Sequence, residues 1–151
     1  MLKIEQGPHA NVHNVYFEKV KGKWKQRIFF CSDIHWDSKK CRRDMLKKHF
    51  DHCKANDIPI FIFGDMFDLM QGRNDKRRSK SNLRGEFNTT AHFTAIAKQA
   101  VEWFAPYAHL IQLIGDGNHE TSVLRNNEFD FIDLFIMLIK METGHDIKRG
   151  Y

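Results

Sequence analysis

The sequence lacks an apolar run long enough to cross a membrane. Its longest apolar stretch, residues 129–141, is interrupted by Asp130, Asp133 and Lys140, and it falls short of the ~20 residues that a membrane span needs. Residues 1–10 also lack the apolar segment of a secretory signal. We therefore expect no membrane association and interpret residues 129–141 as a buried helix.

Cysteine is scarce and unpatterned. The three cysteines, Cys31, Cys41 and Cys53, are odd in number and show no C-x-x-C spacing. This argues against a disulfide framework and against a thiolate zinc site. We expect three reduced thiols and a cytoplasmic location.

Repeats and low-complexity tracts are also missing, and the composition is that of a globular protein. With 151 residues, 42% of them hydrophobic and 28% charged, the chain can form one domain with a real core. We expect a single domain over residues 1–151, introduced by a lead-in hairpin over residues 1–26. Its turn is placed at Lys21-Gly22-Lys23, after a β-rich stretch over residues 12–20.

The net charge of +5 comes from one basic loop, residues 72–85, which carries six cations and one acid. Such a loop can steer a polyanion toward a nearby site. It can equally be a solvated surface loop. Arg77, Arg78 and Lys80 are its candidate substrate contacts, and His92, at the start of the next expected helix, is a fourth.

Apolar periodicity predicts alternating strands and helices. Strands are expected at 27–31, at 58–63, from 110, and again from about 146. Helices are expected over 41–53, behind Ser38, then from a cap at Thr89 or Thr90 to Phe104, and over 129–142. The order βαβαβα is typical of a parallel sheet in an α/β fold.

Three clusters of polar side chains follow the first three expected strands. They are Asp33-Ile34-His35, Gly64-Asp65-Met66-Phe67-Asp68 and Gly117-Asn118-His119-Glu120. The carboxyl ends of parallel strands share one edge of the sheet, where α/β proteins bind ligands. Carboxylate, imidazole and amide donors suit Mn, Fe, Zn and similar divalent ions. The pattern therefore predicts a metal site.

The spacing within the clusters suggests roles. Asp33 and His35 alternate along an extended segment, so both can reach one ion. Asp65 can share its two carboxylate oxygens between two ions, and Asn118 offers a neutral oxygen to the second. His119 suits a general acid or transition-state donor. Glu120 could orient its imidazole.

Taken together, D-x-H, G-D-x-x-D and G-N-H-E in this order resemble the signature of calcineurin-like metallophosphoesterases, over residues 27–120. The resemblance implies the amino-terminal βαβαβα half of a four-layer α/β/β/α sandwich. It also implies phosphoester hydrolysis by a dinuclear centre with a bridging hydroxide. Manganese is the first choice, and iron, zinc, nickel or magnesium would also suit. Asp33 and His35 would hold the first ion, Asp65 would bridge, Asn118 would hold the second, and His119 would assist.

One departure from the family pattern concerns its later histidines, which include a G-H-x-H element. Gly144-His145-Asp146-Ile147 lacks the second histidine, and His145 is interpreted as incidental. About half of the ligands are then present. The chain is expected to be a fragment, to receive the rest from a partner chain or an oligomer, or to be a non-catalytic metal- or phosphate-binding half-domain.

The branch of the superfamily stays partly open. Leu69 stands where protein Ser/Thr phosphatases of this superfamily typically have Arg, and His119 stands where UDP-diacylglucosamine pyrophosphatases usually have Arg. Both branches are disfavoured. Related nucleases keep this histidine, so the substrate is a phosphorylated small molecule or a DNA or RNA phosphodiester.

Overall fold

The computed structural model describes residues 2–18, 21–69 and 81–150, so most of the basic loop lies outside the described residues. The elements in chain order are β1 (Leu2–Gln6), β2 (His13–Phe17), β3 (Phe29–Cys31), α1 (Arg43–Ala55), β4 (Ile60–Phe63), η1 (Gly85–Phe87), α2 (His92–Phe104), η2 (Ala105–Tyr107), β5 (Ile111–Gly115), α3 (Asn118–Asn127), α4 (Phe131–Thr143) and β6 (Lys148–Gly150).

A parallel sheet organises the molecule. Its strands lie in the order β3-β4-β5-β6, and each pair is parallel. Chain order and spatial order coincide, because each crossover returns to the same edge of the growing sheet. The predicted α/β fold with a parallel sheet is confirmed, and so is a strand after residue 146.

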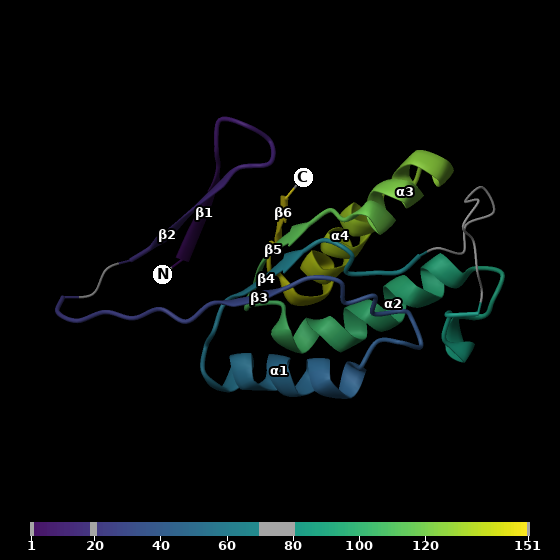
Figure 1. Cartoon of the computed structure of the whole chain (residues 1–151), viewed down its shortest axis with the longest axis horizontal. Coiled ribbons are helices and arrows are strands. Elements are labelled where there is room, and N and C mark those ends of the chain that lie inside the picture. Colours follow the sequence, from purple (N-terminus) through teal and green to yellow (C-terminus); the bar gives the residue numbers. More distant parts are fainter. Residues whose placement is uncertain (1, 19–20, 70–80, 151) are drawn as a thin grey trace.

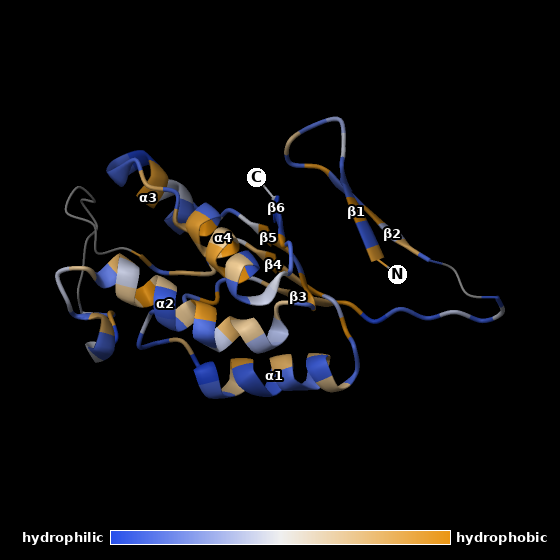
Figure 2. Ribbon diagram, turned by 180° about the vertical axis from the view of Figure 1, so that it is seen from behind, coloured by the Kyte–Doolittle hydropathy of each residue, from blue (hydrophilic) through white to orange (hydrophobic). Residues whose placement is uncertain are grey.

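Helices α1, α2 and α4 cover one face of this sheet (Figure 1). Strand alternation explains the layer, since Ile60 and Ile62 of β4 are fully buried in the helix-side core. Three buried aromatic rings join the helices: Phe50 of α1 packs on Phe104 of α2, and Phe104 packs on Phe135 of α4. Hydrophobic residues dominate α4, whereas α1 is largely hydrophilic, as expected for a more exposed helix (Figure 2).

The opposite face of the sheet is only partly covered. The β1-β2 hairpin lies on this side (Figure 1), and an apolar pocket of about 450 Å³ is lined mostly by residues of β2 to β6. Two aromatic rings on the sheet remain open to solvent, with Phe30 59% and Phe63 53% exposed. The ring of Phe61 lies beside Phe30 but is buried.

The amino-terminal hairpin turns earlier than predicted. β1 and β2 pair antiparallel from Leu2↔Phe17 to Gln6↔His13, so the turn spans residues 7–12 and not Lys21-Gly22-Lys23. The amide of Gly7 donates to the Val12 carbonyl at 2.8 Å. The Gln6 side-chain amide also donates to three carbonyls of this turn. These side-chain bonds stabilise a turn that has little apolar patterning of its own.

Two predicted helix starts are corrected. α1 begins at Arg43 and not near Cys41, because the segment after Ser38 pairs with residues 82–83 through a Ser38↔Leu83 bridge. α2 is preceded by Ala91, so neither Thr89 nor Thr90 is its cap.

The predicted final helix is present, shifted by one or two residues. Asp130 caps α4 by accepting a 2.9 Å hydrogen bond from the Asp133 amide, and Gly144 ends it in a left-handed conformation. Among the described helices, none is long and apolar enough to cross a membrane.

Candidate metal centre

Three loops meet at the carboxyl edge of the sheet. Asp33 and His35 follow β3, Asp65 follows β4, and one ligand atom of each lies within 4.8 Å of the other two. Asp68 and His119 form a second such group with His35. The sheet thus brings together donors that are far apart in the sequence, as the strand-end pattern predicts.

Four residues of these loops have left-handed backbones. Asp33, His35, Asp65 and Leu69 have φ between 45° and 53°. This region is unfavourable for residues with a Cβ, costs roughly 1–3 kcal/mol each, and clusters at functional sites. Backbone hydrogen bonds across the loops hold the conformation: the Asp33 amide donates to Gly64 at 3.2 Å and the His35 amide donates to Asp65 at 3.0 Å.

Two glycines allow the β4 and β5 loops to touch. A Cβ on Gly64, which has φ 74°, would lie 2.8 Å from the Gly117 Cα. A Cβ on Gly117 would lie 2.7 Å from Cγ of Asp65. A Cβ on either glycine would therefore collide with the neighbouring loop. Both positions require glycine because the two loops approach so closely beside the Asp65 carboxylate.

Glu120 fixes these two loops to each other. Its buried carboxylate accepts hydrogen bonds from the amides of Asp65 (3.1 Å), Phe67 (3.0 Å) and Gly117 (3.0 Å). Burial raises the pKa of this carboxyl, and the amide donors act against that rise. Glu120 therefore does not orient the imidazole of His119, and the sequence hypothesis for its role is wrong.

Asp68 takes the role that the sequence hypothesis assigned to Glu120. Nδ1 of His119 lies 2.7 Å from the Asp68 carbonyl oxygen and 3.2 Å from its carboxylate. Both partners are acceptors, so Nδ1 carries a proton and Nε2 is the nitrogen left for other contacts. The hydrogen bond to the Asp68 carboxylate raises the pKa of His119 to about 9. The His35 ring lies beside it, with ring centroids 4.6 Å apart.

A further carboxylate near the site, that of Asp37, was missed by the sequence reasoning. Its side chain is completely buried and accepts hydrogen bonds from the amides of Asp68 (2.6 Å) and Leu69 (3.0 Å). Burial raises the pKa of Asp37, although these two hydrogen bonds favour its charged form. Nothing in the local sequence marks it, since an Asp between Trp36 and Ser38 has the pattern of an ordinary loop.

The donors open into a pocket of about 290 Å³. The described residues that line it are Asp33, Ile34, His35, Ser38, Lys40, Cys41, Asp68, Asn82 and His119. Lys40 and Asn82 were not predicted. Asn82 reaches the site because its carbonyl accepts the Lys39 amide at 2.7 Å, and only tertiary pairing could reveal this contact.

The donor set fits a divalent metal ion. Asp33, His35 and Asp65 offer oxygen and nitrogen atoms from two loops that backbone hydrogen bonds join. Nδ1 of His35 is buried and has no hydrogen-bond partner among the described residues. A buried imidazole nitrogen without a hydrogen-bond partner is costly in an ordinary loop. It is expected where that nitrogen is available as a metal ligand.

Comparison with protein families gives the same answer as the geometry. The family model of calcineurin-like phosphoesterases matches residues 26–147. The chain belongs to the calcineurin-like phosphoesterase family. Comparisons with curated proteins and with solved structures gave no significant match. The resemblance inferred from the three motifs is therefore confirmed.

The remaining predicted site residues of the chain are placed less centrally. Asn118 is the exposed first residue of α3, directly before His119. His92 begins α2 with its ring against Phe93, and it is not among the described residues that line the pocket. His145 lies beside His109, near the start of β5 and away from the metal-ligand groups. Arg77, Arg78 and Lys80 lie outside the described residues.

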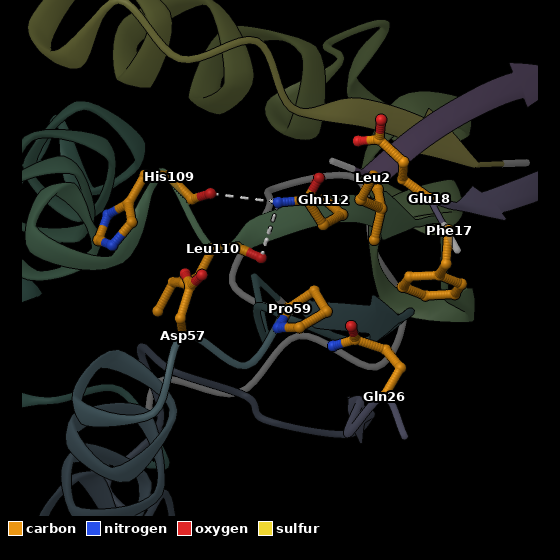
Figure 3. A pocket seen from close by; sticks show the side chains of 9 residues that line it. All are labelled: Leu2, Phe17, Glu18, Gln26, Asp57, Pro59, His109, Leu110 and Gln112. Carbon is orange, nitrogen blue, oxygen red and sulfur yellow. Dashed lines mark hydrogen bonds between the residues drawn. The ribbon is translucent and has the colours of Figure 1, made fainter. Parts of the chain in front are cut away.

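Another pocket, about 330 Å³ in volume, lies at the amino edge of the sheet (Figure 3). It contains Asp57 and His109 but none of the motif residues. In Figure 3 the Gln112 side chain donates to the carbonyls of His109 (3.2 Å) and Leu110 (3.1 Å). These bonds shape the wall and leave no convergent set of donors among the residues that line this pocket.

Proposed function

We propose that the chain hydrolyses a phosphoester at a dinuclear metal centre on the carboxyl edge of its sheet. The observation that supports this most is the convergence of Asp33, His35 and Asp65, whose ligand atoms lie within 4.8 Å of one another. Family membership supplies the reaction class, since calcineurin-like phosphoesterases are metal-dependent hydrolases.

The ligands divide between two ions in this proposal. Asp33 and His35 would hold the first, Asp65 would contribute to both, and Asn118 would offer its amide oxygen to the second. Two divalent ions bound there, manganese by preference, would supply an activated water and neutralise the phosphate oxygens. Donors still missing from such a centre would come from another polypeptide segment, in cis or from a partner chain.

His119 acts on the leaving group in this proposal. Asp68 binds Nδ1 and keeps the imidazole protonated, because the pKa of His119 is raised to about 9. Nε2 can then donate a hydrogen bond or a proton to the oxygen that departs. Glu120 contributes indirectly, by holding the loops of Asp65 and Gly117 together.

The substrate proposed is a phosphorylated small molecule or a nucleic acid, and a nuclease is the alternative within this class. Lys40 at the pocket adds positive charge for an anionic substrate. Arg77, Arg78 and Lys80 would extend that charge along a polymer. We also propose a cytoplasmic location, where Cys31, Cys41 and Cys53 remain thiols.

The test is metal binding and hydrolysis with Mn²⁺ by the chain together with the polypeptide segment that supplies the missing donors. Mn²⁺ binding is measured by electron paramagnetic resonance, and turnover is measured with p-nitrophenyl phosphate and bis-p-nitrophenyl phosphate. Asp65→Asn removes the charge shared by both ions and should lower turnover by about 1,000-fold or more. The matched control Asp133→Asn, on exposed α4 surface, should leave turnover unchanged. Absence of Mn²⁺ binding by the wild type, or full activity of Asp65→Asn, would show that the proposal is wrong.

A further inference from the structure

The buried carboxylate of Asp37 lies behind the site and not in it. It is absent from both groups of metal-ligand atoms and from the described residues that line the pocket. It is nevertheless among the most completely buried charged side chains of the described part, with 0% exposure. A buried carboxylate is expensive unless its oxygens accept strong hydrogen bonds, so its partners indicate why it is there.

Both partners of Asp37 belong to the loop that carries Asp68. One carboxylate oxygen accepts from the Asp68 amide at 2.6 Å, and the other accepts from the Leu69 amide at 3.0 Å. Leu69 has a left-handed backbone with φ 49°. The two hydrogen bonds thus stabilise an unfavourable turn and fix the peptide plane on each side of Asp68.

The same residue, Asp68, contacts His119 through two groups. Its carbonyl oxygen and its carboxylate both face Nδ1 of the imidazole. A change in the orientation of the Asp68 backbone would move both acceptors at once. The contacts therefore form a continuous path from Asp37, through the turn at Asp68 and Leu69, to the ring of His119.

We propose that Asp37 is a positioning residue that sets the orientation of the His119 imidazole through the turn at Asp68 and Leu69. The inference rests on the proposed function, in which His119 is the catalytic residue. A carboxylate is needed because its two oxygens each accept from one amide. An asparagine has one oxygen, and its NH₂ group would face the second amide as donor against donor.

The kinetic test is a double-mutant cycle with His119. Asp37→Asn should lower kcat of the Mn²⁺-loaded chain roughly 10- to 100-fold, since a misplaced catalytic group loses orientation. KM and Mn²⁺ affinity should stay within about twofold. In the His119→Ala background Asp37→Asn should have no further effect, because the pathway ends at the missing ring. Equal decreases in both backgrounds would show a purely structural role and overturn the proposal.

A nuclear magnetic resonance readout tests the positioning without any activity. In metal-free protein, Asp37→Asn should shift the Asp68 and Leu69 amide protons upfield and speed their exchange. It should also weaken the Nδ1–H signal of His119. The exposed control Asp51→Asn, on α1, should change none of these signals.

The two readouts separate the possible failures. If the wild type shows no Mn²⁺-dependent turnover, the proposed function fails, and the His119 imidazole signals still decide whether Asp37 positions the ring. Unchanged His119 signals in a folded Asp37→Asn variant would overturn the inference, even if the proposed function holds. Asp37→Ala gives a second variant, which removes both hydrogen bonds without introducing a donor clash.

Discussion

The two edges of the parallel sheet differ in a way that cavity size does not reveal. The pocket at the amino edge is about 330 Å³ and the one at the carboxyl edge about 290 Å³. At the amino edge, Gln112 bonds only to carbonyls of its own segment. At the carboxyl edge, Asp37 and Glu120 together bind five backbone amides of the site loops. Convergent donors held by buried partners locate the chemistry better than volume does.

Strand direction explains the contrast. Every strand of the sheet is parallel, so β3, β4 and β5 all release their loops at the same edge. α3 begins there as well, and its first turn favours negative charge, since the His119 amide donates to the Asp65 carboxylate at 3.0 Å. Helix α1 ends at the opposite edge, just before β4, so its carbonyl end faces away from the site.

Among the variants that test this contrast, the largest effect is expected from adding a Cβ between the two site loops that are in contact. Gly117→Ala places a Cβ 2.7 Å from Cγ of Asp65, so the carboxylate must move. We expect Mn²⁺-dependent turnover to fall more than about 100-fold. We also expect the free energy of unfolding to drop by about 2 kcal/mol, measured by urea denaturation.

Gly85→Ala is the matched control, since no heavy atom lies within 4 Å of its added Cβ. Its stability should stay within about 0.5 kcal/mol of wild type. Wild-type turnover in Gly117→Ala would show that activity does not depend on the close contact between the site loops. The contrast drawn between the two edges of the sheet would then be wrong.

An intermediate effect is expected from Asp68→Asn. Removal of the carboxylate should return the pKa of His119 from about 9 toward 6.5, measured by nuclear magnetic resonance titration of the metal-free protein. Because the pKa is raised in the folded state, this pair stabilises the wild type fully below pH 6.5, and the stabilisation is lost as the pH rises through about 9.

The same substitution should lower kcat roughly 10- to 100-fold. His109→Ala at the amino edge is its control and should leave the His119 titration unchanged. A pKa that stays near 9 in Asp68→Asn would contradict the role given to this carboxylate.

The smallest effect concerns the basic loop. Neutralising Arg77, Arg78 and Lys80 should weaken the salt dependence of nucleic-acid binding. The slope of log K against the logarithm of the salt concentration should become shallower by roughly 0.7–0.9 for each phosphate that is no longer bound. Hydrolysis of a small phosphomonoester should barely change, because its single phosphate is held at the metal site. Fluorescence titrations of DNA and RNA at several salt concentrations measure the slope. An unchanged slope for DNA and RNA would favour the alternative interpretation, in which residues 72–85 are a solvated surface loop without a role in substrate binding.

Much of the sheet and of the donor set could be predicted from the sequence. Apolar runs such as Ile60–Phe63 are strong signals, and the polar clusters begin where these runs end. Helix α3 was missed because its residues are mostly polar and only Glu120 and Val123 are buried. The hairpin turn was misplaced because Gly22 offered a clearer local turn signal than residues 7–12, which are stabilised by the Gln6 side chain.

The supporting contacts of the site could not be predicted in the same way. Residue spacing suggests which side chains share a strand end, but it does not say which way a carboxylate turns. Glu120 stands next to His119 in the sequence yet binds backbone amides of the neighbouring loop. Asp37 and Asp68, separated by a helix and a strand, meet only after the sheet has formed. These hydrogen-bond partners are determined by tertiary packing, which local sequence patterns do not report.

The strand order also determines when the site can exist during synthesis. Asp33 and His35 leave the ribosome two βα units before His119, and at roughly 5–20 residues per second the delay is several seconds. Until β5 pairs with β4, Asp65 lacks the amide partner that His119 supplies and the glycine contact that confines it. In the proposed centre, the ligand Asn118 and the contacts that confine Asp65 would therefore come late, and a nascent chain stalled before residue 111 would present its first two acidic loops without the third wall of the centre.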